Sequence, residues 1–106
     1  MRLLVMFDLP VGSKAERKSY AKFRKFLIED GYRMEQFSVY SRVLLTREAM
    51  ATHVARLRLN LPEAGSVTVL TLTERQYADR LVLLKPAAPR STPAPEEGPV
   101  QLTLVF

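Results

Sequence analysis

A run of five apolar residues, Leu3 to Phe7, ends on the carboxylate of Asp8 and is followed by Leu9 and Pro10. Continuous apolar runs of this length are typical of strands that are buried on both faces. We therefore expect Arg2 to Asp8 to form a central strand around which the rest of the chain is arranged. The chain has 106 residues, which fits one domain, and 47% of them are apolar, too many for a disordered chain.

The rest of the first 84 residues divides into further elements. Ser13 and Glu16 form a capping box, which predicts a helix from Ser13 to about Asp30, where Gly31 can end it. Hydrophobic periodicity then predicts a strand over Gln36–Leu45 and a helix over Arg47–Leu59 that Thr46 caps. The buried stripe of this helix is expected to consist of Met50, Val54, Leu57 and Leu61. The pattern continues with a strand over Ser66–Thr73, a turn or single helical turn over 74–79, and a short strand over Arg80–Leu84. We assign the pattern to the order β-α-β-β-α-β. This is the α+β, ferredoxin-like plan, an antiparallel sheet with two helices on one face.

The last part of the chain differs in composition from residues 1–84, the predicted ferredoxin-like domain. Residues 85–99 contain five of the seven prolines and are expected to form an extended linker. In residues 100–106, Val100, Leu102, Leu104 and Phe106 alternate with Gln101, Thr103 and Val105, which predicts an extra C-terminal strand. An isolated strand is unstable, so it should dock on a sheet edge of its own chain or, as we predict, of a partner protomer in a dimer.

The net charge of +5 and the pI of about 9.9 are compatible with a polyanionic partner and also with a basic protein that has none. No cysteine is present, and no apolar run is long enough to cross a bilayer. We therefore expect a cytoplasmic protein with no membrane partner.

Basic side chains gather on one side of the first predicted helix, opposite Tyr20, Phe23 and Leu27. Such a stripe is either a solvated helix face or a surface that contacts nucleic-acid phosphates without reading sequence. Eleven of the sixteen basic residues of the chain are arginine, which suits phosphate geometry. The candidate nucleic-acid-binding residues are Lys14, Arg17, Lys18, Lys22 and Lys25.

Asp8 is the acidic residue at the end of the predicted central strand. It is either a turn carboxylate that accepts backbone N–H bonds around Leu9 to Gly12 or a metal ligand and catalytic residue. Mg²⁺ is often held by one or two carboxylates together with phosphate oxygens and water, and a two-fold axis beside the strand would supply a second Asp8. The one histidine, His53, is expected to be solvated rather than catalytic. The sequence contains no phosphate-binding glycine motif and no paired-histidine motif.

Four stretches in this order resemble the CRISPR-associated protein 2 family. They are MFDLP from Met6, ERKSYAKFRKFLIEDGY from Glu16, QFSVYSR from Gln36 and LTLTERQYADRLVLL from Leu70. The resemblance covers Met1 to about Leu84. It implies a ferredoxin-like homodimer whose C-terminal strand crosses to the partner's sheet. It also implies a bridge between integrase dimers, with the spacer-precursor duplex DNA on the basic surface.

In the same resemblance, Asp8 matches a strand-end aspartate that is described as a Mg²⁺ ligand for nuclease activity in some members of the family. Some of these relatives carry a basic residue two positions before the glutamine of the Q-x-S-V motif, where this chain has Met34. The leading hypothesis is therefore an architectural, duplex-DNA-binding subunit of spacer acquisition that partners a CRISPR integrase. The alternatives are a Mg²⁺-dependent endonuclease, acting on RNA or DNA through Asp8, and a related ribonuclease toxin.

Overall fold

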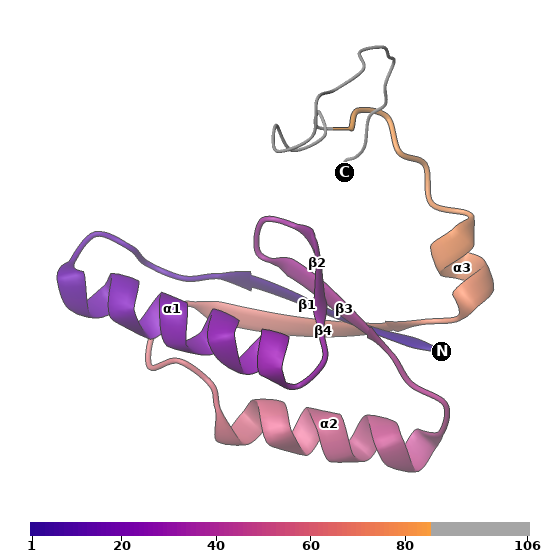
Figure 1. The fold of residues 1–106 in the computed structure, drawn as a ribbon, viewed down its shortest axis with the longest axis horizontal. Coiled ribbons are helices and arrows are strands. Elements are labelled where there is room, and N and C mark those ends of the chain that lie inside the picture. Colours follow the sequence, from indigo (N-terminus) through magenta and orange to yellow (C-terminus); the bar gives the residue numbers. More distant parts are fainter. Residues whose placement is uncertain (86–106) are drawn as a thin grey trace.

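The computed structural model describes residues 1–85, which form a four-stranded antiparallel sheet and three helices (Figure 1). In chain order the elements are β1 (Arg2–Asp8), α1 (Lys14–Glu29), β2 (Arg33–Gln36), β3 (Val39–Val43), α2 (Arg47–Leu59), β4 (Ser66–Leu72) and α3 (Glu74–Ala78). The first six elements follow the order β-α-β-β-α-β. Two strands, β2 and β3, precede α2, where the residue pattern predicts the single strand Gln36–Leu45. The predicted α+β, ferredoxin-like fold is confirmed.

Strand β1 lies inside the sheet, whose spatial order is β2-β3-β1-β4. All three pairs of neighbouring strands are antiparallel. In the register, Val5 lies between Tyr40 of β3 and Val69 of β4, and Asp8 lies opposite Ser66. The strand that ends on Asp8 is therefore central, as its apolar run predicts.

The capping box predicted for α1 is present in both directions. The Ser13 N–H donates to Glu16 Oε1 at 2.9 Å, and the Glu16 N–H donates to Ser13 Oγ at 3.1 Å. After α1, Gly31 adopts a φ of +92°, a conformation that favours glycine. Thr46 caps α2 through a 3.0 Å bond from the Ala49 N–H. Local hydrogen bonds thus fix where both long helices begin.

The hydrophobic core lies between one face of the sheet and helices α1 and α2, which Figure 1 shows on the same side. Leu3, Val5 and Phe7 point into it, whereas Leu4 and Met6 are only half-buried on the opposite face, which we call the outer face. The expectation that β1 is buried on both faces is therefore wrong for the single chain. The reason is that both long helices cover one face and the short α3 covers only a corner of the other.

Two predicted strands are divided differently in the structure. The stretch Gln36–Leu45 is not one strand, because a turn at Phe37 and Ser38 reverses the chain between β2 and β3. Ser38 adopts a φ of +64°. Serine is not a residue type that marks a positive φ in a sequence, so the pattern does not predict this turn. Arg80–Leu84 is not a strand, because no neighbouring strand pairs with it within residues 1–85. For residues 74–79 the sequence leaves a turn or a single helical turn open, and the structure has the helical turn, α3.

The buried stripe of α2 also differs in part from the prediction. Leu57 is buried, and Met50 and Val54 pack against the core, but Leu61 is 49% exposed because it follows the end of the helix. The predicted linker over residues 85–99, apart from Lys85, and the predicted strand over residues 100–106 lie outside the described residues. Within residues 1–85, none of the helices has the length and apolar character needed to cross a membrane.

Candidate nucleic-acid interface

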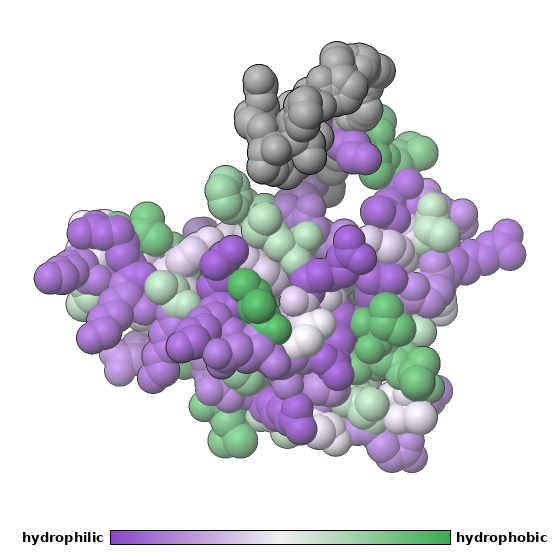
Figure 2. Space-filling model, in the orientation of Figure 1, coloured by the Kyte–Doolittle hydropathy of each residue, from purple (hydrophilic) through white to green (hydrophobic). Residues whose placement is uncertain are grey.

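The five basic residues predicted on α1 are all exposed, and they lie opposite the buried Phe23 and Leu27. Two of them have local partners: Arg17 Nη1 donates to the Val11 carbonyl at 3.1 Å, and Lys25 Nζ lies 4.0 Å from Glu29. The other three, Lys14, Lys18 and Lys22, make no ion pair with any residue of the described chain. Hydrophilic side chains gather over α1 in Figure 2. We call these five residues the basic stripe.

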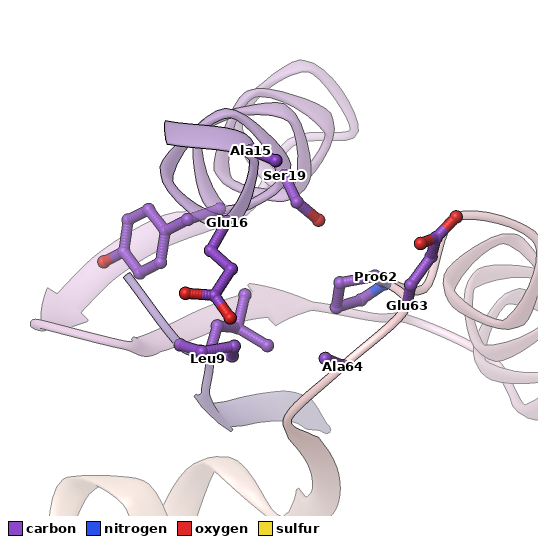
Figure 3. A pocket seen from close by; sticks show the side chains of 9 residues that line it. Leu9, Ala15, Glu16, Ser19, Pro62, Glu63 and Ala64 are labelled. Carbon is purple, nitrogen blue, oxygen red and sulfur yellow. The ribbon is translucent and has the colours of Figure 1, made fainter. Parts of the chain in front are cut away.

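The basic stripe borders an open groove of about 670 Å³ between α1 and the segment that leaves α2. Lys18, Lys22 and Lys25 contribute to one side of it, and residues 59–63 form the other. A smaller hollow of about 120 Å³ adjoins the groove, and Ala15, Ser19, Pro62 and Glu63 line both. In Figure 3 the side chain of Glu16 extends toward Leu9 at the edge of this hollow. One oxygen of Glu16 is already bound to the Ser13 N–H, so that carboxylate serves the helix cap.

Asp8 stands at the end of β1 with an exposed side chain. Because Phe7 points into the core, alternation along the strand places the Asp8 side chain on the outer face. The carboxylate accepts no hydrogen bond from Leu9 to Gly12, and it forms no ion pair within residues 1–85. These contacts do not support the turn-carboxylate interpretation, and they leave the carboxylate free for a ligand.

The backbone at Asp8 is held closely even though its side chain is free. Gly65 has a φ of +96°, and a Cβ added there would lie 2.5 Å from the Asp8 carbonyl oxygen. The loop before β4 therefore needs glycine where it passes the end of β1. Within residues 1–85 no three histidine or acidic side chains are grouped so that they could hold a metal ion, so one chain supplies Asp8 alone.

The structure does not bring Asp8 and the basic stripe together. The stripe lies on the helix side of the sheet, whereas Asp8 lies on the outer face with the half-exposed Leu4, Met6 and Leu70. The two sets of candidate residues thus belong to two surfaces, and each needs its own test.

A polar network on the outer face, at the opposite end of β1, has no counterpart in the sequence-based predictions. Arg2 binds Glu74 through two hydrogen bonds of 2.8 and 3.3 Å, and Glu35 accepts bonds from Ser41 Oγ at 2.5 Å and from Tyr77 Oη at 2.7 Å. Burial, followed by the hydrogen bond to Glu35, raises the pKa of Tyr77. The sequence signal for this network is the capping box of Thr73 and Gln76, which indicates the start of α3 but does not indicate which residues α3 contacts.

His53 is not solvated, which corrects the expectation from the sequence. Its ring is buried, and its Nδ1 lies 2.9 Å from Asp30 Oδ2, while Arg56 Nη1 donates to Asp30 Oδ1 at 2.7 Å. Burial raises the pKa of Asp30, but the hydrogen bonds from His53 and Arg56 outweigh it and lower that pKa below its ordinary value of 3.8. These three residues tie the end of α1 to α2 and have a structural role.

Comparison with known proteins agrees with the fold and the motifs. Residues 1–80 match the family model described as CRISPR associated protein Cas2. The chain is 56% identical over 84 residues to a protein of Acidovorax ebreus, covering 79% of this chain and 82% of that protein. It is 49% identical over 83 residues to a protein of Streptococcus mutans, covering 78% of this chain and 76% of that protein. Both are named CRISPR-associated endoribonuclease Cas2.

A solved structure supports the same fold. The crystal structure of Streptococcus pyogenes Cas2 at pH 6.5 superposes with a TM-score of 0.60 at 22% identity, covering 78% of this chain and 99% of that one. The region that matches the family model ends near the end of α3, so it contains Asp8, the basic stripe and the polar network. The central strand ending on Asp8, the sheet order and the family match lead to one conclusion: the chain belongs to the CRISPR-associated Cas2 family.

Proposed function

We propose that the chain is a sequence-neutral, duplex-DNA-binding subunit of CRISPR spacer acquisition that acts as a homodimer. The observation that carries the proposal is the basic stripe, in which Lys14, Lys18 and Lys22 are exposed and unpaired within the described chain. Lysines that already neutralise carboxylates contribute little to phosphate binding, whereas free ones release counterions from DNA. Because their contacts are with the DNA backbone, such a surface accepts spacers of any sequence.

The outer face supports the homodimer. It presents Leu4, Met6, Val43 and Leu70 without a covering layer in the described chain, and Val43 and Leu70 are 47% and 48% exposed. A second copy of the same face would bury these side chains, as a two-fold interface requires. The segment Leu81–Leu84, whose leucines are 73–83% exposed, lies beyond α3 and would gain cover from the same partner.

Membership of the Cas2 family suggests the role of the proposed dimer. A bridging role between two integrase dimers requires a rigid platform with a basic surface, and the sheet with its two packed helices provides one. The proposed partners are therefore a second copy of this chain, the CRISPR integrase subunit and the spacer-precursor duplex.

The salt dependence of DNA binding tests the proposed interface. Replacing Lys18 and Lys22 by alanine should weaken duplex binding regardless of sequence and flatten the slope of log K against log salt by about 0.9 for each phosphate that is no longer neutralised. The matched control replaces two exposed arginines of α2, Arg47 and Arg58, and should leave the slope unchanged. An unchanged slope for the lysine variant would show that the stripe is merely solvated.

A Mg²⁺-dependent endonuclease is the second candidate, because Asp8 is exposed and free of protein partners within the described chain and because the relatives are named endoribonucleases. In a dimer joined through the outer face, two Asp8 carboxylates would hold the ion together with phosphate oxygens and water. The bound ion would polarise the phosphate and activate a water molecule. Asp8 itself contributes charge and orientation, and the closely packed Gly65 fixes the backbone that carries it.

Asp8→Asn separates the two candidates. Cleavage of RNA or DNA in Mg²⁺ should fall by about 100-fold or more if Asp8 holds the ion, whereas integration by the complete complex should remain largely intact. Glu48→Gln, which removes an exposed carboxylate in the first turn of α2, is the control and should cleave normally. Loss of integration by a folded, assembled Asp8→Asn complex would contradict the architectural proposal, and unchanged cleavage would contradict the nuclease candidate.

A further inference from the structure

The turn between β2 and β3 presents an aromatic ring to solvent. Phe37 is 85% exposed, whereas the other phenylalanines of the described chain are buried or packed against the core. The next residue, Ser38, has a φ of +64° and is the one residue other than glycine with a positive φ in residues 1–85. Strained backbone of this kind is often kept where it positions a functional side chain.

The turn lies beside the end of β1 that carries Asp8. The Phe7 N–H donates to the Ser38 carbonyl at 3.0 Å, and Met6 pairs with Val39 in the register. Phe37 directly precedes Ser38, whose carbonyl is bonded to Phe7, and Asp8 directly follows Phe7. Figure 1 shows the β2–β3 turn next to the arrowhead of β1. An exposed ring and a free carboxylate thus stand at the same end of the sheet.

An exposed aromatic ring near a free carboxylate is suited to binding a nucleic acid. Every base offers a flat π-face, and an exposed aromatic side chain can stack on it without reading sequence. Such stacking needs a base that is free of its helix, so it selects single strands over duplexes. A base held on Phe37 would place a neighbouring phosphodiester near the end of β1, where Asp8 stands.

We infer that Phe37 is a stacking contact for an unpaired base of a single-stranded nucleic acid, which it positions next to Asp8. The inference deepens the endonuclease candidate and rests on it for the role of Asp8, but stacking can be measured without cleavage. It assigns Phe37 as a positioning residue, because the ring holds the substrate and takes no part in bond breaking.

The absence of tryptophan from the sequence allows a direct test. Phe37→Trp introduces a single indole whose fluorescence should be quenched on titration with a single-stranded RNA or DNA oligonucleotide, and not with the matching duplex. Leu45→Trp is the matched control, because Leu45 is 90% exposed but follows β3 at the opposite end from the turn. Comparing the RNA and DNA oligonucleotides identifies the preferred strand.

Binding and cleavage by three further variants complete the test. Phe37→Tyr keeps a ring and should bind a single strand as the wild type does, whereas Phe37→Leu keeps only the apolar bulk and should bind about tenfold more weakly. Phe37→Leu should also raise KM for cleavage and leave kcat nearly unchanged, since the ring binds the substrate but does not react. Asp8→Asn in the Phe37→Trp background should still show quenching.

The outcomes separate the inference from the function on which it rests. Quenching with no Asp8-dependent cleavage keeps the stacking contact and rejects the nuclease. Asp8-dependent cleavage with no quenching, or with equal binding by Phe37→Leu and wild type, overturns the inference and keeps the nuclease. Indole emission that is already blue-shifted before any oligonucleotide is added would also overturn it, because Phe37 would then lie in a protein interface.

Discussion

Among single residues, Asp30 makes contacts that are distant in sequence. Its side chain is 10% exposed and binds His53, 23 residues away, and Arg56, while its carbonyl accepts a bond from Arg42. The capping pattern places Asp30 correctly at the end of α1 but carries no sign of these partners. Helical periodicity counts histidine as polar and cannot detect a carboxylate on another helix, which is why it predicts a solvated His53.

Replacing Asp30 should make the pH dependence of stability visible. We expect Asp30→Asn to lower the free energy of unfolding by about 1–3 kcal/mol at pH 7, because it removes a charge-assisted pair. A lowered carboxyl pKa stabilises the fold above the ordinary value of 3.8, and this stabilisation disappears as the pH falls through the lowered native pKa. Urea unfolding from about pH 2 to pH 7 should show the difference from wild type shrinking toward acid pH.

A control for this prediction is Asp79→Asn, whose carboxylate is 73% exposed and lies 3.8 Å from Arg75. Exposed ion pairs contribute little, so this variant should stay within about 0.5 kcal/mol of wild type at every pH. An Asp30→Asn difference that stays constant down to about pH 2 would contradict the role assigned to the Asp30 charge.

Among the elements, α3 depends most on tertiary contacts. It has five residues, too few for a helix that is stable alone. The Tyr77 ring lies between two guanidinium groups, with Arg2 Cζ 3.8 Å and Arg80 Cζ 3.9 Å from its centroid. With the bonds from Arg2 to Glu74 and from Tyr77 to Glu35, this packing holds α3 against the outer face.

Tyr77→Ala should release α3 while leaving the core folded. Amide hydrogen exchange at residues 74–79 is expected to become as fast as in an unstructured peptide, while β1 and α1 keep their protection. Tyr77→Phe keeps the stacked ring and removes only the hydroxyl bond to Glu35, so it should be milder, at about 1 kcal/mol. Unchanged exchange in Tyr77→Ala would show that the capping box alone maintains the helix.

The elements with local signals are the ones that sequence patterns predict. The capping box of Ser13, the helical periods of α1 and α2 and the apolar run of β1 each place an element, because neighbouring residues carry the information. The β2–β3 turn escapes such prediction because Phe37 and Ser38 lack the glycine, asparagine or aspartate that marks such turns. Arg80–Leu84 has the composition of a strand but no pairing partner in its own described chain, and composition cannot supply one.

The candidate site divides in the same way. Exposure of the basic stripe follows from helix geometry, and exposure of Asp8 follows from its position at a strand end, so both are accessible to sequence analysis. The placement of Phe37 beside Asp8 and the network around Arg2 depend on strand register and on the return of α3. These arise only when distant segments meet.

For the whole molecule, the proposed dimer makes the C-terminal segment testable. Residues 85–99 could span about 46 Å if extended at ~3.1 Å per residue, enough to carry residues 100–106 to another protomer. There Leu102 and Leu104 would fill shallow apolar sites beside an added strand. Truncation after Leu84 should therefore weaken the dimer, and sedimentation over a concentration series should show it dissociating at higher protein concentration than the full chain.

A suitable control replaces Glu96 and Glu97 by glutamine, which keeps the length and the alternating apolar residues of the segment. This variant should sediment as the full chain does. A truncated chain that remains as dimeric as the full chain would show that the segment does not join the two protomers.

The alternation along β1 has a consequence for how this protein tolerates change. Its odd positions, Leu3, Val5 and Phe7, lie in the core of a single chain, whereas its even positions, Leu4 and Met6, face outward. Polar replacements at odd positions should therefore reduce folding yield, and those at even positions should spare it and reduce only assembly. Folding and dimer assembly thus constrain different positions of the same short strand. A library of β1 variants, sorted once by expression level and once by dimer formation, would measure the two constraints separately at each residue.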